Sequence, residues 1–459
     1  MNVQRAVRWA LWGTVGVLHA TNAMAQEEIW LNDEQLVEGR GVQRNRLRYT
    51  GGLAAALGYD SNVFLRSGSA DERRGDAFTI KITPFIRINT QAPDQAPEQA
   101  TKSPYALSAS ASLSYLEFIQ GPTQSGRPTE DLTSHRNFGF TSNLRLRIAP
   151  DARWGGELHG SATRTIQPSN LGDPTATFNR TNPSLGGTVV WTPGGGLFVW
   201  KVIGYDMMYN YFEADRFQRY NNFNHIIRSN ANWQILPQTS LFGDSRLIFI
   251  RYTNPTEQND GDVFAARVGV NSLLTYRFGF LTALGWTTSV FESKNGAPRQ
   301  DFDRLMAHAE ARFFLSSPPK NTKEVIRTYP TKLTIGYIRD SNQSYIGNFY
   351  NRDRAYMALY YFFAHRVRST IQFSVAHLGF PATYFEDGTP RDTPFSSLAV
   401  GGTLFMEYLP RQHVGLFVNG DYMSQITDKP IRVNRFDPTI TDDLGFHRFR
   451  LTLGLRYLL

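Results

Sequence analysis

The arginines of this chain are the side chains whose type and spacing could do chemistry. In the closing stretch RFRLTLGLRYLL, residues 448–459, Arg448, Arg450 and Arg456 alternate with apolar residues. A guanidinium is permanently charged and has five N–H donors, so a row of guanidiniums would attract and hold anions. Alternation with a period of two is typical of a β-strand that has one apolar face and one polar face.

The same alternation places further bases on the polar faces of other segments. The predicted set is Lys81, Arg87, Arg145, Arg147, Arg153, Arg228, Arg267, Arg304, Arg312, Arg366, Arg368, Arg448, Arg450 and Arg456. The acids predicted on these faces are fewer: Glu157, Asp206, Glu310, Glu407 and Asp421. A basic surplus between low-dielectric walls concentrates anions. For each single arginine, a structural ion pair with a neighbouring acid is the alternative.

One pair on these faces could serve as an acid and a base. His308 and Glu310 share their face with Arg304 and Arg312, although a charged wall accounts for the four residues better. The sequence contains neither a zinc-protease motif nor a phosphate-binding glycine loop. It also lacks cysteine, which excludes thiolate nucleophiles and cysteine zinc sites. We therefore predict no catalytic residue, no metal site and no cofactor, and hence no enzyme.

The first residues, 1–25, have the three parts of a secretory signal peptide. Arg5 and Arg8 form a basic start, an apolar run covers 9–18, and Ala-Met-Ala precedes Gln26. No later apolar run reaches the roughly 18 residues that a transmembrane helix needs. The chain, with a net charge of +8 and 41% hydrophobic residues, is therefore predicted to leave the cytoplasm without a helical anchor.

The predicted bases must be positioned by β-strands, because polar and apolar residues alternate around them with a period of two. After residues 26–46, predicted to be a short periplasmic arm, residues 47–459 alternate in polarity throughout. The segments lie near 47–64, 76–91, 104–120, 134–149, 152–166, 179–192, 196–211, 220–235, 239–254, 262–276, 281–293, 301–315, 329–340, 350–363, 366–380, 395–409, 412–425 and 444–459. We predict an all-β fold, a transmembrane antiparallel up-and-down β-barrel of about 18 strands with an apolar outside and a polar lumen.

The connections between these segments alternate in length. Short joins such as 149–152 and 192–196 are followed by longer polar loops. Outer-membrane barrels have short periplasmic turns and long external loops, so both termini are predicted to be periplasmic. Aromatic residues gather on the turn side, as at a membrane interface: Tyr105, Trp154, Trp191, Trp233, Tyr276, Tyr361, Tyr408 and Tyr457.

A barrel of about 18 strands is wide enough for an aqueous channel. We expect the loops 381–394 and 426–443, which carry both signs of charge, to narrow it. The alternative for both loops is a solvated position at the surface. Two turn-side connections, 91–103 and 316–329, are longer and contain proline. With the amino-terminal arm they would face the periplasm and could dock a partner there.

The carboxyl terminus fits an assembly signal. Gly454, Tyr457 and Leu459 form a pattern that resembles the terminal-strand motif recognised by the outer-membrane insertion machinery, with leucine where that motif favours phenylalanine. We therefore expect this machinery and outer-membrane lipid to be partners, and we expect no nucleic-acid partner.

The opening strand carries one family resemblance. Residues 51–68, GGLAAALGYDSNVFLRSG, contain the run Tyr59-Asp60-Ser61-Asn62-Val63. This stretch resembles the start of beta-barrel porin family 2, and the architecture is similar to that of the alginate export porin. The resemblance implies an outer-membrane conduit that exports an exopolysaccharide, with a periplasmic polysaccharide copolymerase as a possible partner.

Two other functions remain open. The same lumen would serve a diffusion porin for small anionic solutes. A non-transport scaffold or adhesin would instead have a plugged barrel. The sequence does not identify the polymer or solute, the gate or the oligomeric state.

Overall fold

The structure is a computed structural model. It describes residues 42–44, 47–63, 76–90, 104–120, 136–150, 152–165, 179–193, 196–254, 259–292, 300–315, 331–344, 348–363, 366–384, 390–411, 413–432, 441–442 and 444–459. The predicted signal peptide, most of the predicted arm and the connections 91–103 and 316–329 lie outside these residues. Among the described residues, no helix is long and apolar enough to cross a membrane.

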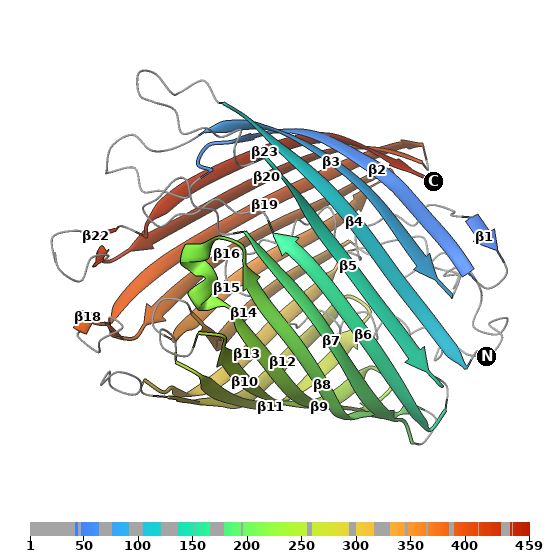
Figure 1. Ribbon diagram of the computed structural model, residues 1–459. Coiled ribbons are helices and arrows are strands. Elements are labelled where there is room, and N and C mark those ends of the chain that lie inside the picture. Colours follow the sequence, from blue (N-terminus) through green and yellow to red (C-terminus); the bar gives the residue numbers. More distant parts are fainter. Residues whose placement is uncertain are drawn as a thin grey trace.

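Eighteen antiparallel strands form a closed barrel (Figure 1). They are β2 (Leu47–Asp60), β3 (Ala77–Asn89), β4 (Tyr105–Gln120), β5 (Asn137–Ile148), β6 (Trp154–Thr165), β7 (Arg180–Trp191), β8 (Phe198–Phe212), β9 (Asn222–Leu236), β10 (Thr239–Tyr252), β11 (Gly261–Thr275), β12 (Phe278–Phe291), β13 (Asp303–Phe314), β14 (Lys332–Gln343), β15 (Phe349–Phe363), β16 (Val367–Phe380), β19 (Phe395–Arg411), β20 (Val414–Thr427) and β23 (Phe446–Leu458). The predicted fold class is confirmed.

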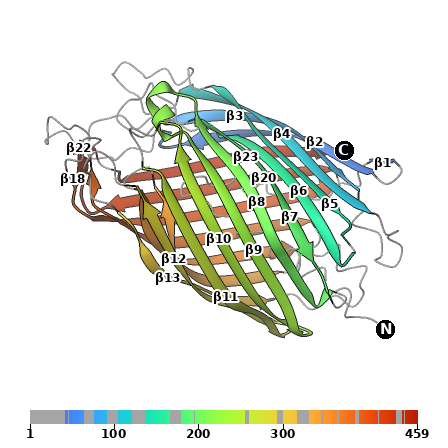
Figure 2. The same ribbon diagram turned by 60° about the horizontal axis from the view of Figure 1, so that its bottom comes forward.

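The ring closes where the first barrel strand meets the last. β2 pairs with β23 from Gly52 opposite Leu458 to Asp60 opposite Arg450. Every other barrel strand pairs with its neighbours along the chain. Figure 2 shows the strands running obliquely around one wall. β2 begins and β23 ends at the same end of the barrel, where short turns join the strands. We call this end the turn end and the opposite end the loop end.

The predicted segments differ from the strands by up to four residues: β2 ends at Asp60, where 64 was predicted, and β5 begins at Asn137, where 134 was predicted. β12 begins at Phe278, where 281 was predicted, because a tight turn at Tyr276 and Arg277 returns the chain directly into the ladder. β14 continues to Gln343, past the predicted end at 340. Its last residues are polar on both faces, so they carry no alternation that the sequence could show.

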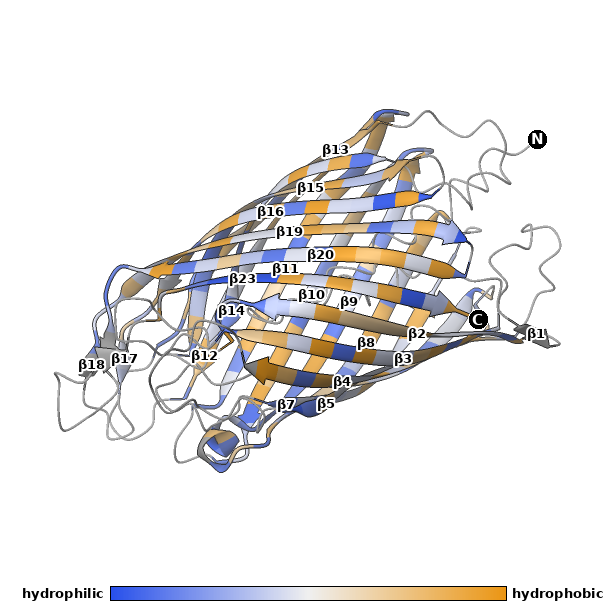
Figure 3. Ribbon diagram, turned by 90° about the horizontal axis from the view of Figure 1, so that it is seen from above, coloured by the Kyte–Doolittle hydropathy of each residue, from blue (hydrophilic) through white to orange (hydrophobic). Residues whose placement is uncertain are grey.

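Several short elements were not predicted, because two or three residues carry no periodicity. β1 (Val42–Arg44) pairs with the start of β2, inside the predicted arm. A 3₁₀ helix, Asp215–Tyr220, follows β8. The loops predicted to narrow the channel contain the hairpins β17 (Thr383–Tyr384) with β18 (Pro390–Asp392) and β21 (Ile431–Arg432) with β22 (Thr441–Asp442). These described parts stand beyond the loop end and not inside the barrel (Figures 1 and 3).

The apolar residues of each strand face outward. Leu57, Leu185 and Val268 have exposed fractions of 64%, 65% and 68%, far above what a buried core would leave. Apolar and polar residues alternate along the strands (Figure 3). Because a closed barrel has an outside and an inside, the exposed apolar residues cover the outside and the polar residues of opposite parity face inward.

The predicted aromatic residues lie at the turn end of this outer face; we call these eight residues the turn-side girdle. Seven of them are more than 40% exposed, from Tyr408 at 42% to Tyr276 at 58%. The eighth, Trp191, lies between Trp154 and Trp200, with ring centroids 5.9 and 6.2 Å away. The turn end of the outside is thus an aromatic surface, as expected where hydrocarbon meets water.

Candidate functional site: the charged inner face

Most of the predicted bases lie in the inward-facing register. They are Lys81, Arg87, Arg145, Arg147, Arg228, Arg267, Arg304, Arg312, Arg368, Arg448, Arg450 and Arg456. Two predicted bases do not belong to the inner wall. Arg366 is exposed in the turn before β16. The guanidinium of Arg153 lies over the outward-facing ring of Trp191, at 5.9 Å from its centroid.

The wall from β5 to β9 holds bases around two carboxylates. Glu157 is 9% exposed, and its oxygens lie 3.3 Å from Nε of Arg145 and 3.4 Å from Nε of Arg147. The two arginine side chains are themselves 53% and 43% exposed. Asp206 lies 3.0 Å from Nε of Arg228 and also contacts His159. The guanidiniums of Arg145 and Arg147 therefore remain accessible to water and ions inside the barrel.

The wall from β10 to β15 carries a longer polar network. Arg267 donates from Nε to Asp244 at 2.6 Å. Glu310 accepts hydrogen bonds from Arg312 and from the Tyr356 hydroxyl. Arg312 also donates to the side-chain oxygen of a neighbouring asparagine on β11 at 3.0 Å.

This network bears on the predicted acid/base pair. Nε2 of His308 lies 3.2 Å from the Tyr356 hydroxyl and 4.0 Å from Glu310. Glu310 already accepts from Arg312 and Tyr356, and Arg304 makes no ion pair with it. The arrangement is that of a charged wall. Among the described residues, no group of three or more His, Cys, Asp or Glu side chains could hold a metal ion.

Glycines on the inner face leave space for the large side chains of this network to lie flat against the wall. A Cβ at Gly336 would collide with the ring of Tyr356, and one at Gly285 would collide with Arg267. Both glycines face inward: Gly285 lies opposite Arg267 on the adjacent strand, and Gly336 lies opposite Tyr356. Because the glycines leave this space, the Tyr356 ring and the Arg267 stem pack against neighbouring backbone.

The sequence missed further charges on the inner wall. The missed bases are Arg48, Arg180, Lys201, Arg246, Lys332, Arg352 and Arg354, and the missed acids are Asp60, Asp244 and Asp340. Arg352 pairs with Asp340 at 2.6 Å. Within the described residues, neither Arg246 nor Arg354 lies within ion-pair distance of a carboxylate, and Arg354 stacks on Tyr356 with its guanidinium 5.3 Å from the ring centroid. Bases outnumber acids on the described inner wall.

The turn end of the inner wall contains the most deeply buried carboxylate among the described residues. Glu407 on β19 is 0% exposed and contacts both Arg368 on β16 and Arg456 on β23. A Cβ at Gly415 would collide with the carboxylate. Arg368 and Arg456 are thus part of a buried structural network, in which the shared acid offsets one of the two positive charges.

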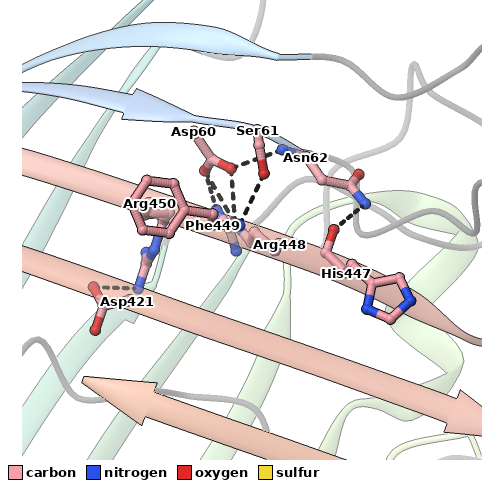
Figure 4. A network of polar contacts seen from close by, with 8 residues as sticks. All are labelled: Asp60, Ser61, Asn62, Asp421, His447, Arg448, Phe449 and Arg450. Atoms are coloured by element: carbon pink, nitrogen blue, oxygen red, sulfur yellow. Dashed lines mark hydrogen bonds and ion pairs between the residues drawn. The ribbon is translucent and has the colours of Figure 1, made fainter.

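The loop end of the β2–β23 seam holds a second network (Figure 4). The carboxylate of Asp60 accepts from Nε of Arg448 at 2.9 and 3.1 Å. One of its oxygens also accepts from the backbone N–H of Asn62 at 3.1 Å. Arg450, on the same strand as Arg448, lies 3.4 Å from Asp421 on β20.

Past the end of the regular ladder, the chain stays attached to β23. The N–H of Ser61 donates to the carbonyl of Phe449 at 2.9 Å, and the N–H of Phe449 donates to the Ser61 hydroxyl at 2.8 Å. The Asn62 side chain donates to the carbonyl of His447 at 2.9 Å. Asn62 is 0% and Val63 1% exposed. The run 59–63, on which the family resemblance depends, therefore forms a seam latch, a segment that joins the first barrel strand to the last.

The residues of the predicted assembly signal occupy different environments. Gly454 faces inward beneath the ring of Phe417. Tyr457 and Leu459 are 48% and 62% exposed at the turn end. The N–H of Leu459 donates to the carbonyl of Gly51 at 2.8 Å, so the last residue extends the seam. Recognition of these residues by the insertion machinery stays a prediction.

No family model matches this chain, and no curated protein matches it in sequence. Membership of beta-barrel porin family 2 is therefore not confirmed. The fold is similar to that of OccAB4 of Acinetobacter baumannii, with 10% identity and a TM-score of 0.45 over 90% of this chain and 98% of that chain. It is also similar to OpdK of Pseudomonas aeruginosa solved with vanillate (10%, TM-score 0.44, 90% and 99%). A third similar structure is the FrpB iron transporter of Neisseria meningitidis, F3-3 variant (8%, TM-score 0.45, 91% and 82%).

These likenesses concern the barrel architecture alone. The closed ring, the apolar outside and the turn-side girdle define the class of protein on this chain's own residues: a transmembrane β-barrel with a charged inner face.

Proposed function

We propose that the chain is an outer-membrane porin that conducts anionic solutes along its basic inner face. The observation that carries this proposal is the surplus of bases on the described inner wall, above all Arg246 and Arg354, which lie outside ion-pair distance of any described carboxylate. In a low-dielectric enclosure an uncompensated positive charge raises the local concentration of anions and lowers that of cations.

The orientation follows from the connections. We propose that the turn end, with both termini, faces the periplasm and that the loop end faces outward, as in single-chain outer-membrane barrels. A solute would then pass between the loops and along the arginine-bearing walls β5–β9 and β10–β15. The half-exposed Arg145 and Arg147 on one wall and Arg354 on the other would contact it.

Reversal potentials test this proposal. The purified protein in a planar bilayer, with a potassium chloride gradient, should prefer chloride to potassium. The double variant Arg246→Gln/Arg354→Gln should shift the reversal potential toward the unselective value, because it removes two positive charges that form no ion pair with a described carboxylate. The matched control Arg251→Gln/Arg339→Gln removes two outward-facing arginines and should leave the potential unchanged. Cation preference of the wild-type protein would overturn the proposal.

Export of an exopolysaccharide is the more specific form of this function. Beyond the resemblance of the opening strand, one observation favours a sugar polymer: β15 places Tyr356 and Tyr360 on its inward face. Phenol rings offer an apolar face and a hydroxyl, which suits hydrated sugar rings. The amino-terminal arm and the connections 91–103 and 316–329 would then dock a periplasmic polysaccharide copolymerase.

Two measurements separate the polymer from small anions. Deleting the gene should abolish surface polysaccharide while synthesis at the inner membrane continues. Unchanged surface polysaccharide would exclude export. Liposomes that contain the protein should swell quickly in small anionic solutes if it is a diffusion porin, and slowly if it is a gated exporter.

A further inference from the structure

The loop end of the outer face carries ion pairs that point away from the lumen. We call three of them the loop-rim belt: Arg136–Glu117, Arg251–Asp262 and Arg339–Asp353. Their shortest nitrogen–oxygen distances are 3.5, 2.8 and 3.8 Å, and the three arginine side chains are 53%, 42% and 40% exposed. The belt spans the strands from β4 to β15 and thus lies around much of the circumference.

Aromatic groups at the same level hydrogen-bond to outward-facing carboxylates. The Tyr337 hydroxyl donates to Asp353 at 2.5 Å, and the Trp286 indole donates to Asp303. A charged side chain that faces lipid is strongly unfavourable at the bilayer midplane and nearly neutral at the interface. The loop-rim belt therefore lies at the level of lipid headgroups.

The turn end is built differently. Among the described strand residues, every outward-facing carboxylate lies at the loop end, and the turn end shows rings. The arginines near that end, such as Arg153 and Arg277, lie in the turns over the rings of Trp191 and Tyr276. The two ends of the outer face thus suit two membrane leaflets of different chemistry. The leaflet with the more highly charged headgroups would lie at the loop end.

We infer that the loop-rim belt binds the phosphate groups of lipid headgroups in that leaflet. Guanidiniums bind phosphate oxygens bidentately. The partner carboxylates hold the guanidiniums at headgroup level, and each guanidinium has five N–H donors, more than one carboxylate can occupy. The inference rests on the proposed placement in an outer membrane and adds the headgroup chemistry and the residues that recognise it.

Lipid binding to the purified full-length barrel in detergent tests this inference. The probes are bisphosphorylated lipid A and the same lipid with both phosphates removed, and native mass spectrometry measures the bound fraction. The wild-type protein should bind the phosphorylated lipid about tenfold or more tightly than its dephosphorylated form. The triple variant Arg136→Gln/Arg251→Gln/Arg339→Gln should lose this preference.

A matched control removes the same number of charges from the inside: Arg145→Gln/Arg147→Gln/Arg304→Gln should keep the wild-type preference. Heat-modifiable migration in gel electrophoresis establishes that both variants contain folded barrels. Equal binding of the two lipids by the wild-type protein would overturn the inference, as would an unchanged loop-rim variant or an equal loss in the inner variant. Because this assay measures no solute flux, a channel without anion preference would leave its result intact.

Discussion

The turn end and the loop end of the barrel differ on the outside and agree on the inside. Outside, both ends carry aromatic rings, but only the loop end of the described strands adds arginine–carboxylate pairs. Inside, each end holds a buried carboxylate at or beside the seam: Glu407 at the turn end and Asp60 at the loop end. The two ends thus share the device of a buried carboxylate between arginines or beside one, and they differ in the charge that they show on the outside.

The largest effect should come from the inner network at the turn end. Glu407→Gln leaves Arg368 and Arg456 buried without their shared countercharge, so we expect a loss of about 3–5 kcal/mol in the free energy of unfolding. Urea titration of the barrel in lipid vesicles, followed by tryptophan fluorescence, measures it. A loss below about 1 kcal/mol would show that water or ions screen the two guanidiniums.

The corresponding change at the loop end should be smaller. Asp60→Asn keeps the shape of the side chain but removes the charge that Arg448 contacts, and Arg448 is less buried than Arg456. We expect a loss of roughly 1.5–3 kcal/mol in the same titration. Combining it with Arg448→Gln completes a double-mutant cycle. Additive losses would mean that Asp60 and Arg448 do not stabilise each other. A buried ion pair would then stabilise the turn end but not the loop end.

On the outside, the turn-side girdle should matter for stability. Trp191→Ala removes the ring contacts with Trp154 and Trp200, for an expected loss of about 1–2 kcal/mol. Trp233→Ala is the control, because Trp233 belongs to the girdle but is 53% exposed. If both variants lose the same free energy of unfolding, the loss comes from removing an indole ring from the membrane–water interface and not from removing contacts between rings.

The smallest effect on stability should come from the loop-rim belt. Arg251→Gln breaks an ion pair whose two side chains are both 42% exposed, so the free energy of unfolding should change by less than about 1 kcal/mol. We expect this variant to unfold like the wild-type protein in vesicles of a neutral glycolipid that contains no phosphate. A larger loss there would mean that the belt stabilises the barrel without any lipid phosphate.

The sequence predicts the barrel because each strand carries its own alternation. Lys81 and Arg87 alternate with isoleucines, so their face could be assigned from neighbours alone. Arg352 and Arg354 could not be assigned in this way, because Asp353 between them belongs to the outer face at the loop rim. There both faces are polar and the alternation disappears.

Contacts between residues far apart in sequence could not be predicted either. Asp60 and Arg448 are 388 positions apart, and no local pattern links them. The run around Asp60 therefore suggested a family motif, whereas the structure shows a seam latch. Glycines were the signal that sequence analysis overlooked: Gly285 and Gly336 stand on the polar parity of their strands, where a small residue indicates a neighbouring side chain that lies across it.

The pairing of β2 with β23 has a consequence for synthesis. Without the last 13-residue strand, the folded sheet would have two open edges with unsatisfied N–H and C=O groups, and such edges recruit other strands. A chain that ends prematurely before Phe446 would therefore be prone to aggregate.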